Sequence, residues 1–247
     1  MNAIAAEWMK ARTLRSTWWA LGVAVFVSLG LTLAGAGTVV ARWAGVAQSP
    51  DQTAMGIVVA VYVGVILAQL PLGMLGTMTI TGEHASGMLD VTRTATPSVT
   101  RILLAKAAVL TGASLAVSLL IAVPGYVYGR FLAADHHPSL LPAQVWPVIA
   151  GGTLMIVVTT LLGLSLGALL RNGAAATAAL VAIVLVLPLV ARMLPWGEVA
   201  NRLLPAIPAL QLIKQMPPVM PDAAAFAVLG AWGVVPLAIA AVVMRRS

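Results

Sequence analysis

The sequence predicts an all-α integral membrane protein with six transmembrane helices. Hydrophobic residues make up 61% of its 247 residues and charged residues only 9%, whereas about a quarter of the residues of an average soluble domain are charged. The mean hydropathy is +1.01, so lipid must surround most of the chain. The charged residues also leave six uncharged runs, each long enough for the roughly 20 residues that a membrane helix needs.

The six uncharged runs define the predicted membrane helices of a single transmembrane domain, residues 1–247. We expect the first run to be an uncleaved span, because its 26 residues from Ser16 exceed the roughly 7–15 apolar residues of a secretory signal peptide. Pro71 and Pro124 predict kinks in the second and third helices. The predicted helices cover residues 17–41, 54–80, 101–129, 145–170, 174–191 and 223–244, and the third begins before its uncharged run, with Arg101 and Lys106 leading into the membrane.

The distribution of lysine and arginine predicts that both chain ends face the cytoplasm. With the N-terminus inside, nine of the 14 basic residues flank the cytoplasmic ends of the helices and five lie outside. Positive residues favour cytoplasmic loops, and long loops count less in this rule. Three of the five outer basic residues lie in one long segment. Without them, the excess of basic residues on the cytoplasmic side is larger. The connection between the second and third helices is therefore predicted to be cytoplasmic.

Residues 1–16 predict a helix that lies in the cytoplasmic headgroup plane before the chain enters the bilayer. Trp8 falls on an apolar side of this helix, whereas Glu7 and Lys10 fall on another side, and Arg15 interrupts the apolar side. Tryptophans beside basic residues are typical of the membrane–water interface. The alternative interpretation is an ordinary basic flank that only sets the topology.

The connection between the second and third helices, ITGEHASGMLDVTRTATPSVTRILLAK, gathers three basic and two acidic residues. We expect a short helix over residues 83–95, with Glu83 near its start and Arg93 near its end, where they suit the helix dipole. Pro97 then breaks the chain, and Ser98 is a plausible cap for the next helix. Such a stiff element joined to two membrane helices transmits displacement. A simple polar loop is the alternative.

The outer segment, residues 192–222, contains six prolines and therefore cannot form one continuous helix. Its LLPAIPALQLI portion is nevertheless apolar. Short helices that enter the outer leaflet, or that cover the outer end of a pathway, fit this pattern. The alternative is a proline-rich connection without a function.

Together these segments resemble the ABC-2 type transporter permeases. That family has an acidic residue after its second helix, then a glycine and a leucine-rich helix, and then a proline followed by Ser/Thr-x-x-Arg and a lysine. The N-terminal segment is similar to the family's interface helix, and LLPAIPAL is similar to its outer Leu-Pro segment. The matching residues are Glu7, Lys10 and Arg15 in the N-terminal segment, and Glu83, Gly87, Leu89, Pro97, Arg101 and Lys106 in the connection.

The resemblance implies the permease subunit of an ATP-binding cassette transporter, usually an exporter, that works in the cell membrane as a homodimer with two separate ATP-binding subunits. Those subunits would bind ATP and Mg²⁺, and this chain would hold no cofactor. The three lysines agree, because none stands in the Gly-x4-Gly-Lys-Ser/Thr pattern of a phosphate-binding loop. Residues 83–97 would then contact the ATP-binding subunit as a coupling segment. The residues expected to carry this contact are Glu83, Gly87, Leu89, Arg93, Pro97 and Arg101.

The six uncharged runs also bear on the cargo. Proton- or sodium-coupled carriers place ionisable residues inside the membrane, and these runs contain none. Gln69 is the main polar side chain available to a pathway. A pathway lined by such apolar residues suits a hydrophobic or amphiphilic compound, such as a drug, a lipid or a natural product.

Two other function classes fit the same topology. A membrane scaffold or assembly protein would share the helices without moving a cargo, and a membrane-embedded enzyme would need convergent catalytic groups. The sequence predicts no catalytic residue, no metal site and no nucleic-acid binding. Residues 163–167, GLSLG, match a Gly-x-Ser-x-Gly nucleophile motif, but they also form a small-xxx-small pattern for close helix packing. Asp135, His136 and His137 are too few and too close together to form a metal site.

Overall fold

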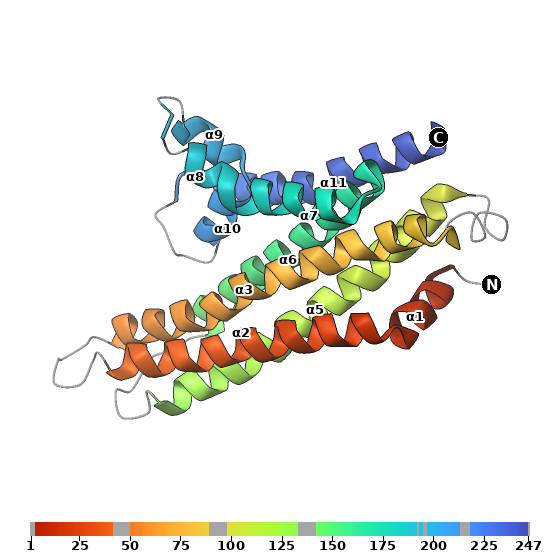
Figure 1. Ribbon diagram of the computed structural model, residues 1–247. Coiled ribbons are helices and arrows are strands. Elements are labelled where there is room, and N and C mark those ends of the chain that lie inside the picture. Colours follow the sequence, from red (N-terminus) through yellow and green to blue (C-terminus); the bar gives the residue numbers. More distant parts are fainter. Residues whose placement is uncertain are drawn as a thin grey trace.

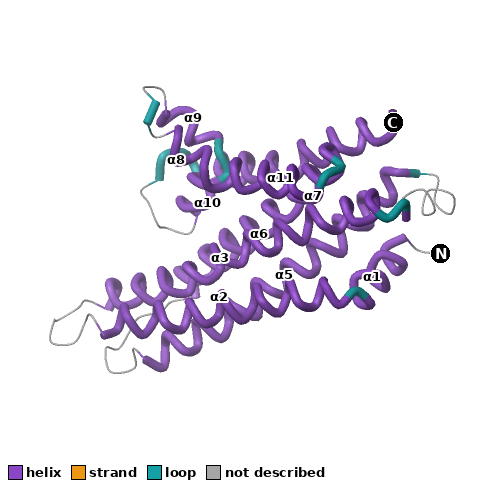
Figure 2. The backbone as a smooth tube through the Cα atoms, in the orientation of Figure 1, coloured by secondary structure: helices purple, strands orange, loops and turns teal. Residues whose placement is uncertain are grey.

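The computed structural model describes residues 3–41, 50–88, 98–132, 142–191, 193–194, 197–212 and 218–246, which are almost entirely helical (Figures 1 and 2). Its long helices are α2 (Arg15–Ala41), α3 (Pro50–Ala85), α5 (Val99–Leu132), α6 (Pro142–Leu170) and α11 (Asp222–Arg246). Its shorter ones are α1 (Ala3–Thr13), α7 (Gly173–Val181), the π-helical turn η2 (Ala182–Val186), α8 (Leu187–Ala191), α9 (Gly197–Leu203) and α10 (Ala206–Leu212).

All six predicted membrane helices lie within helices of the structure. Among the described residues, five segments are long and apolar enough to cross a membrane: Thr17–Val39, Val99–Leu132, Ile149–Leu170, Gly173–Ala191 and Asp222–Arg246. The remaining predicted span, residues 54–80, lies inside the 36-residue helix α3. Its crossing of the membrane stays a prediction.

Helix α3 is the centre of the bundle. It packs against α2, α5 and α6, and α11 packs on α6. Figure 1 shows α2, α3, α5 and α6 running side by side. Helix α7 packs against both α6 and α3. Both chain ends lie at the end of the bundle where α3 stops and α5 begins (Figure 1). That both termini face the cytoplasm stays a prediction.

Small residues allow α3 to approach its neighbours closely. A Cβ atom added to Gly163 of α6 would collide with the carbonyl oxygen of Gly73, and one added to Gly76 would collide with that of Thr160. On the other side of α3, a Cβ atom on Gly64 would collide with the side chain of Thr32 on α2. Close backbone approach of this kind is how membrane helices gain packing energy when lipid is as apolar as the core. The small-xxx-small pattern of residues 163–167 therefore serves packing within this chain.

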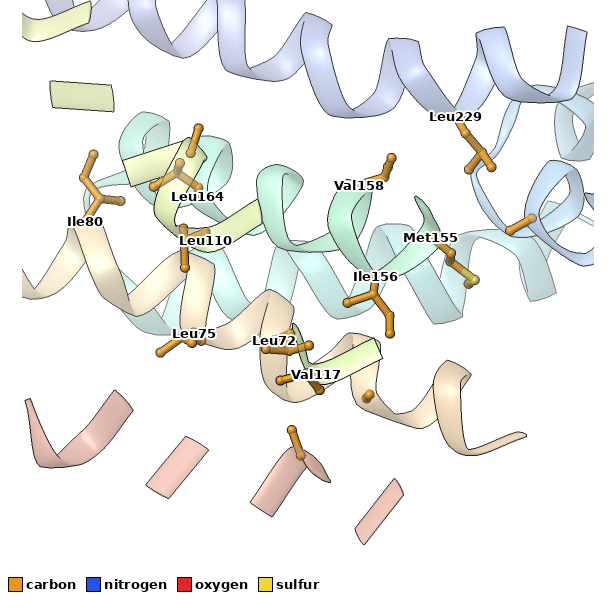
Figure 3. Packing of buried hydrophobic residues seen from close by; sticks show 14 of the residues in the cluster. Leu72, Leu75, Ile80, Leu110, Val117, Met155, Ile156, Val158, Leu164 and Leu229 are labelled. Carbon is orange, nitrogen blue, oxygen red and sulfur yellow. The ribbon is translucent and has the colours of Figure 1, made fainter. Parts of the chain in front are cut away.

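The apolar core follows the α3–α5–α6 contact and extends to α11 (Figure 3). Leu72 and Ile80 of α3 and Ile156 of α6 are fully buried there. Ser165, in the centre of the Gly-x-Ser-x-Gly match, is also buried and donates a hydrogen bond to the carbonyl oxygen of Leu161. A hydroxyl held in this way inside a helix acts as a packing group.

The end of α3 differs from the expectation. The predicted short helix over residues 83–95 does not begin at Glu83, because α3 continues to Ala85 and places Glu83 in its last turn. The helix ends where Gly87 adopts a φ of 68°, a conformation that glycine reaches without steric cost. Residues 89–97 lie outside the described part of the chain. Ser98 directly precedes α5, as expected of a capping position, and its carbonyl oxygen accepts hydrogen bonds from the Arg101 and Ile102 amides.

The described part of the outer segment forms the short helices α9 and α10, and its place at the outer end of a pathway stays a prediction. Helix α10 packs against α6 and α11, and α9 packs against α8 and α10. Gln211 closes the return of the chain to α11, because its amide group bonds the backbone of Val219 and Met220 and the carboxylate of Asp222. With both ends of its amide satisfied, a buried Gln211 stabilises this turn instead of destabilising it.

Candidate functional site

The candidate site is a cluster of four charged residues, Glu7, Lys10, Glu83 and Lys106, which we call the charge cluster. It joins three helices that are far apart in the sequence. Helix α1 contributes Glu7 and Lys10 one turn apart, where two side chains share a face. Helix α3 contributes Glu83 from its last turn, and α5 contributes Lys106 from its second turn. The end of α3 lies beside the beginning of α5, where Glu83 meets Lys106.

Lys106 is the centre of the charge cluster. Its ammonium group lies 2.6 Å from Glu7 Oε2 and 2.8 Å from Glu83 Oε1. The side chain of Lys106 is only 1% exposed. A lysine buried to this degree keeps its charge only when it is paired and hydrogen-bonded, and the two carboxylates supply both.

Lys10 closes the charge cluster from the solvent side. Its ammonium group lies 2.9 Å from Glu7 Oε1 and 2.9 Å from Glu83 Oε1, and its side chain is 30% exposed. Each lysine thus bridges both glutamates. The two positive and two negative charges balance, so the charge cluster is neutral as a whole.

The pKa of Glu83 reflects two opposing effects. Burial by itself would raise this pKa, and the C-terminal end of α3 would also disfavour a negative charge. The charge and hydrogen bond of Lys106, followed by those of Lys10, outweigh the burial and hold the pKa of Glu83 below its ordinary value of 4.5. Glu83 is therefore ionised at neutral pH.

Lys10 shows the complementary effect. Its partial burial would lower the pKa, but hydrogen bonds and charge from Glu7 and Glu83 outweigh this and raise it above its ordinary value of 10.5. The opposite directions of the two pKa changes show that each group stabilises the charged form of the other.

The corner between α1 and α2 positions the charge cluster. Leu14 interrupts the two helices, and the indole N–H of Trp18 donates a hydrogen bond of 2.8 Å to the carbonyl oxygen of Arg12. Thr13 donates a hydrogen bond to the carbonyl oxygen of Lys10. Helix α1 leaves the line of α2 at this corner and packs against α5, which brings Glu7 to Lys106.

A second contact at the same end involves the C-terminal helix. Arg245 Nε donates a hydrogen bond of 2.7 Å to Thr100 Oγ1 at the beginning of α5. The first two turns of α5 are therefore held by α11 at Thr100 and by α1 and α3 at Lys106.

The other residues expected at the site have different surroundings. Trp8 and Arg15 are exposed, which suits the interface helix predicted for residues 1–16, although its depth in the membrane stays a prediction. Arg101 is exposed on α5, and Gly87 ends α3. Leu89, Arg93 and Pro97 lie outside the described residues, as do Asp135, His136 and His137.

Gln69 lies buried between α3 and α6. Its side-chain oxygen accepts a long hydrogen bond of 3.4 Å from Thr159. Other hydroxyl pairs also join neighbouring helices: Ser114 donates to Thr160, and Thr77 shares a hydrogen bond with Thr177. Gln69 therefore contributes to helix packing in this conformation, and its contact with a cargo stays a prediction.

Comparison with known families gives this geometry its context. A family model described as ABC-2 family transporter protein matches residues 3–189, about three quarters of the chain. The chain belongs to the ABC-2 transporter family. No curated protein matches this permease. The family match covers the charge cluster and ends within α8, so it does not extend to α9, α10 or α11.

Membership confirms several of the expectations. The permease is a multi-pass integral protein of the cell membrane. Members of this family are membrane subunits without a nucleotide-binding domain of their own, which implies a partner subunit that binds ATP. The family pattern singled out Glu7, Lys10, Glu83 and Lys106 separately. The structure adds that these four residues meet.

Sequence reasoning did not predict this meeting, although one signal was available. Lys106 is flanked by Ile102, Leu103 and Ala107, all of which are buried with it. A lone lysine in so apolar a run requires an acidic partner. Only a structure shows that Glu7 and Glu83 together fill this role.

Proposed function

We propose that this permease is the membrane subunit of an ATP-binding cassette exporter for a hydrophobic or amphiphilic compound. Two copies would work with two ATP-binding subunits. Family membership supports the transporter class. The uncharged membrane runs support an apolar cargo and disfavour coupling to protons or sodium ions.

The charge cluster carries the mechanical part of the proposal. The coupling segment, residues 83–97, begins in the last turn of α3 and leads into α5. A force on this segment therefore acts on the ends of both helices. Because the buried Lys106–Glu83 pair joins these ends and Glu7 adds α1, the three helices would respond as one body. Rigid-body motion of this kind converts a small displacement at one end into a change of access elsewhere.

The test is the effect of Glu83→Gln on the coupling between ATP hydrolysis and transport. The amide keeps the shape of the side chain but removes its charge, which weakens its bonds to Lys10 and Lys106. With the ATP-binding subunit co-expressed and the complex reconstituted in liposomes, ATPase activity should persist. Transport per ATP hydrolysed should fall at least about fivefold, the lower end of typical coupling between sites.

Glu198→Gln is the matched control, because Glu198 lies on α9, away from the charge cluster. This variant should transport normally. If Glu83→Gln transports as efficiently as Glu198→Gln, the charge cluster does not transmit force.

Arg93→Ala tests the predicted contact between the coupling segment and the ATP-binding subunit. Arg93 is expected to contact the ATP-binding subunit, so its loss should uncouple hydrolysis from transport while the permease still inserts into the membrane. Unchanged coupling would count against this contact.

Co-purification distinguishes the transporter from a membrane scaffold. In lipid nanodiscs the permease should carry the ATP-binding subunit, and hydrophobic or amphiphilic compounds should stimulate the ATPase. An assembly that contains no ATPase would favour the scaffold, and stimulation only by polar solutes would contradict the proposed cargo class.

A further inference from the structure

A cavity of about 450 Å³ lies directly beside the charge cluster, between α1, α2, α3 and α5. This volume falls within the range of roughly 300–1,000 Å³ that is typical of ligand sites. Its rim includes Trp18 and Met78, both of which are exposed. The apolar part of its wall is formed by Trp18, Leu21, Leu75, Met78, Leu110 and Ala113.

One end of this cavity is charged. All four residues of the charge cluster line it, and Arg12 lines it as well. Three basic and two acidic residues leave one net positive charge. The cavity therefore combines a long apolar wall with a polar end that favours a group carrying negative charge.

Glu83 lines the charged end and holds one buried carboxylate oxygen without a hydrogen bond. Its Oε1 atom accepts hydrogen bonds from Lys10 and Lys106, whereas its buried Oε2 atom accepts none from the described residues. The Glu83 residue is only 8% exposed. A buried carboxylate oxygen without a donor is costly, so a ligand that brings an N–H or O–H group to Oε2 gains free energy from it.

We propose that this cavity binds one glycerophospholipid whose headgroup carries a hydrogen-bond donor. The acyl chain would lie along Leu21, Leu75 and Leu110, and the phosphate would lie at the rim near Arg12. The headgroup ammonium of phosphatidylethanolamine, or a headgroup hydroxyl of phosphatidylglycerol, would donate to Glu83 Oε2. Phosphatidylcholine has the same phosphate and chains but no such donor, so it would bind less well.

The lipid would occupy the joint between α1, α3 and α5, so its headgroup would become part of the charge cluster. This inference goes beyond the proposed transport function, because lipid retention is measured without ATP, partner or cargo. A permease that retains the lipid but transports nothing would refute the function alone. A transporting permease without headgroup selectivity would refute the site alone.

The experiment measures lipid retention by the full-length permease. The protein is delipidated in detergent, exposed to equal amounts of phosphatidylethanolamine, phosphatidylglycerol and phosphatidylcholine with identical acyl chains, and analysed by native mass spectrometry. A hydrogen bond to a charged group corresponds to a preference of about tenfold or more. One of the two donor lipids should therefore exceed phosphatidylcholine by about tenfold. Which of them dominates distinguishes an ammonium from a hydroxyl donor.

Ala113→Phe fills the cavity and should abolish the retained lipid. Ala108→Phe is the matched control, because Ala108 is exposed on the same helix and does not line the cavity. It should retain lipid as the wild type does. Thermal unfolding of both variants shows whether they are folded, and Ala113→Leu provides a smaller change with the same expected direction.

Arg12→Gln separates the phosphate contact from the headgroup contact. It should lower retention of all three lipids while leaving their ratio unchanged. The proposal is overturned if phosphatidylcholine is retained equally well, or if Ala113→Phe and Ala108→Phe retain the same amount of lipid.

Discussion

At the scale of single residues, Lys106 shows how a membrane protein accommodates a buried charge. Its ammonium group has two carboxylate partners within 2.8 Å and almost no exposure to solvent. Such a pair gains little over an apolar substitute, but breaking it leaves charges buried without a partner. Lys106 is therefore important because its removal would leave the buried carboxylates of Glu7 and Glu83 without this partner.

Lys106→Met should destabilise the permease by about 3–5 kcal/mol, the typical cost of removing one partner of a buried ion pair. Lys10→Met should cost about 1 kcal/mol or less, because Lys10 is partly exposed to solvent and Lys106 still pairs both glutamates. Denaturant unfolding in detergent micelles measures the difference. Equal losses in the two variants would contradict the central place of Lys106.

The charge cluster also predicts how stability depends on pH. The lowered pKa of Glu83 contributes stability above pH 4.5 that is lost as the pH falls through its value in the folded state. The raised pKa of Lys10 contributes stability below pH 10.5 that is lost as the pH rises through its folded value. The unfolding temperature should therefore be flat between these limits and fall on the acid side. In Glu83→Gln the unfolding temperature should decrease less as the pH is lowered. An unchanged decrease would show that Glu83 does not contribute to the pH dependence of stability.

At the scale of helices, the contact between α3 and α6 depends on glycines whose backbones touch. The backbone of Gly73 lies so close to Gly163 that Gly163 tolerates no side chain, and a Cβ atom added to Gly167 would collide with the carbonyl oxygen of Thr77. Gly112 of α5, in contrast, has open space around it. The same residue type thus serves packing in one helix and has no packing role in another.

Gly163→Ala and Gly112→Ala should change stability in opposite directions. The added methyl group of Gly163→Ala collides with a backbone carbonyl and should cost about 1–3 kcal/mol, as overpacking does. In Gly112→Ala the methyl group meets no atom, so the better helix propensity of alanine should stabilise the permease by up to about 1 kcal/mol. Thermal unfolding of the two variants tests this, and the same sign in both would refute the close contact.

At the scale of the whole molecule, the arrangement of helices predicts which connections share a side of the membrane. The beginning of α5, preceded by Ser98, and the turn between α6 and α7, which contains Arg171, lie at the same end of the bundle as both termini, whereas α9 lies at the other end (Figure 1). The chain contains no cysteine, so single cysteines are labelled without background.

Ser98→Cys and Arg171→Cys should react with a membrane-impermeant maleimide only from the cytoplasmic side. Val199→Cys, an exposed position on α9, should react only from the opposite side. Labelling in intact cells and in inverted vesicles measures both. Reaction of Ser98→Cys in intact cells would invert the topology and separate the charge cluster from any cytoplasmic ATPase.

Much of the architecture was predictable because it depends on local composition. The six apolar runs, the interruption by proline in the outer segment and the helix over residues 3–13 all follow from hydropathy and helix propensity. The extent of α3 was not predictable. The predicted second helix ended at residue 80, whereas α3 continues to Ala85 and so places Glu83 in its last turn.

The sequence by itself determined that this chain is helical, lies in lipid and lacks a phosphate-binding loop, because those properties depend only on which residues are present and in what order. The tertiary structure alone decided that Glu7, Lys10, Glu83 and Lys106 form one cluster. Charges separated by up to 99 residues attract one another only after packing has brought their helices together, and that packing depends on glycine contacts whose partners no local pattern specifies.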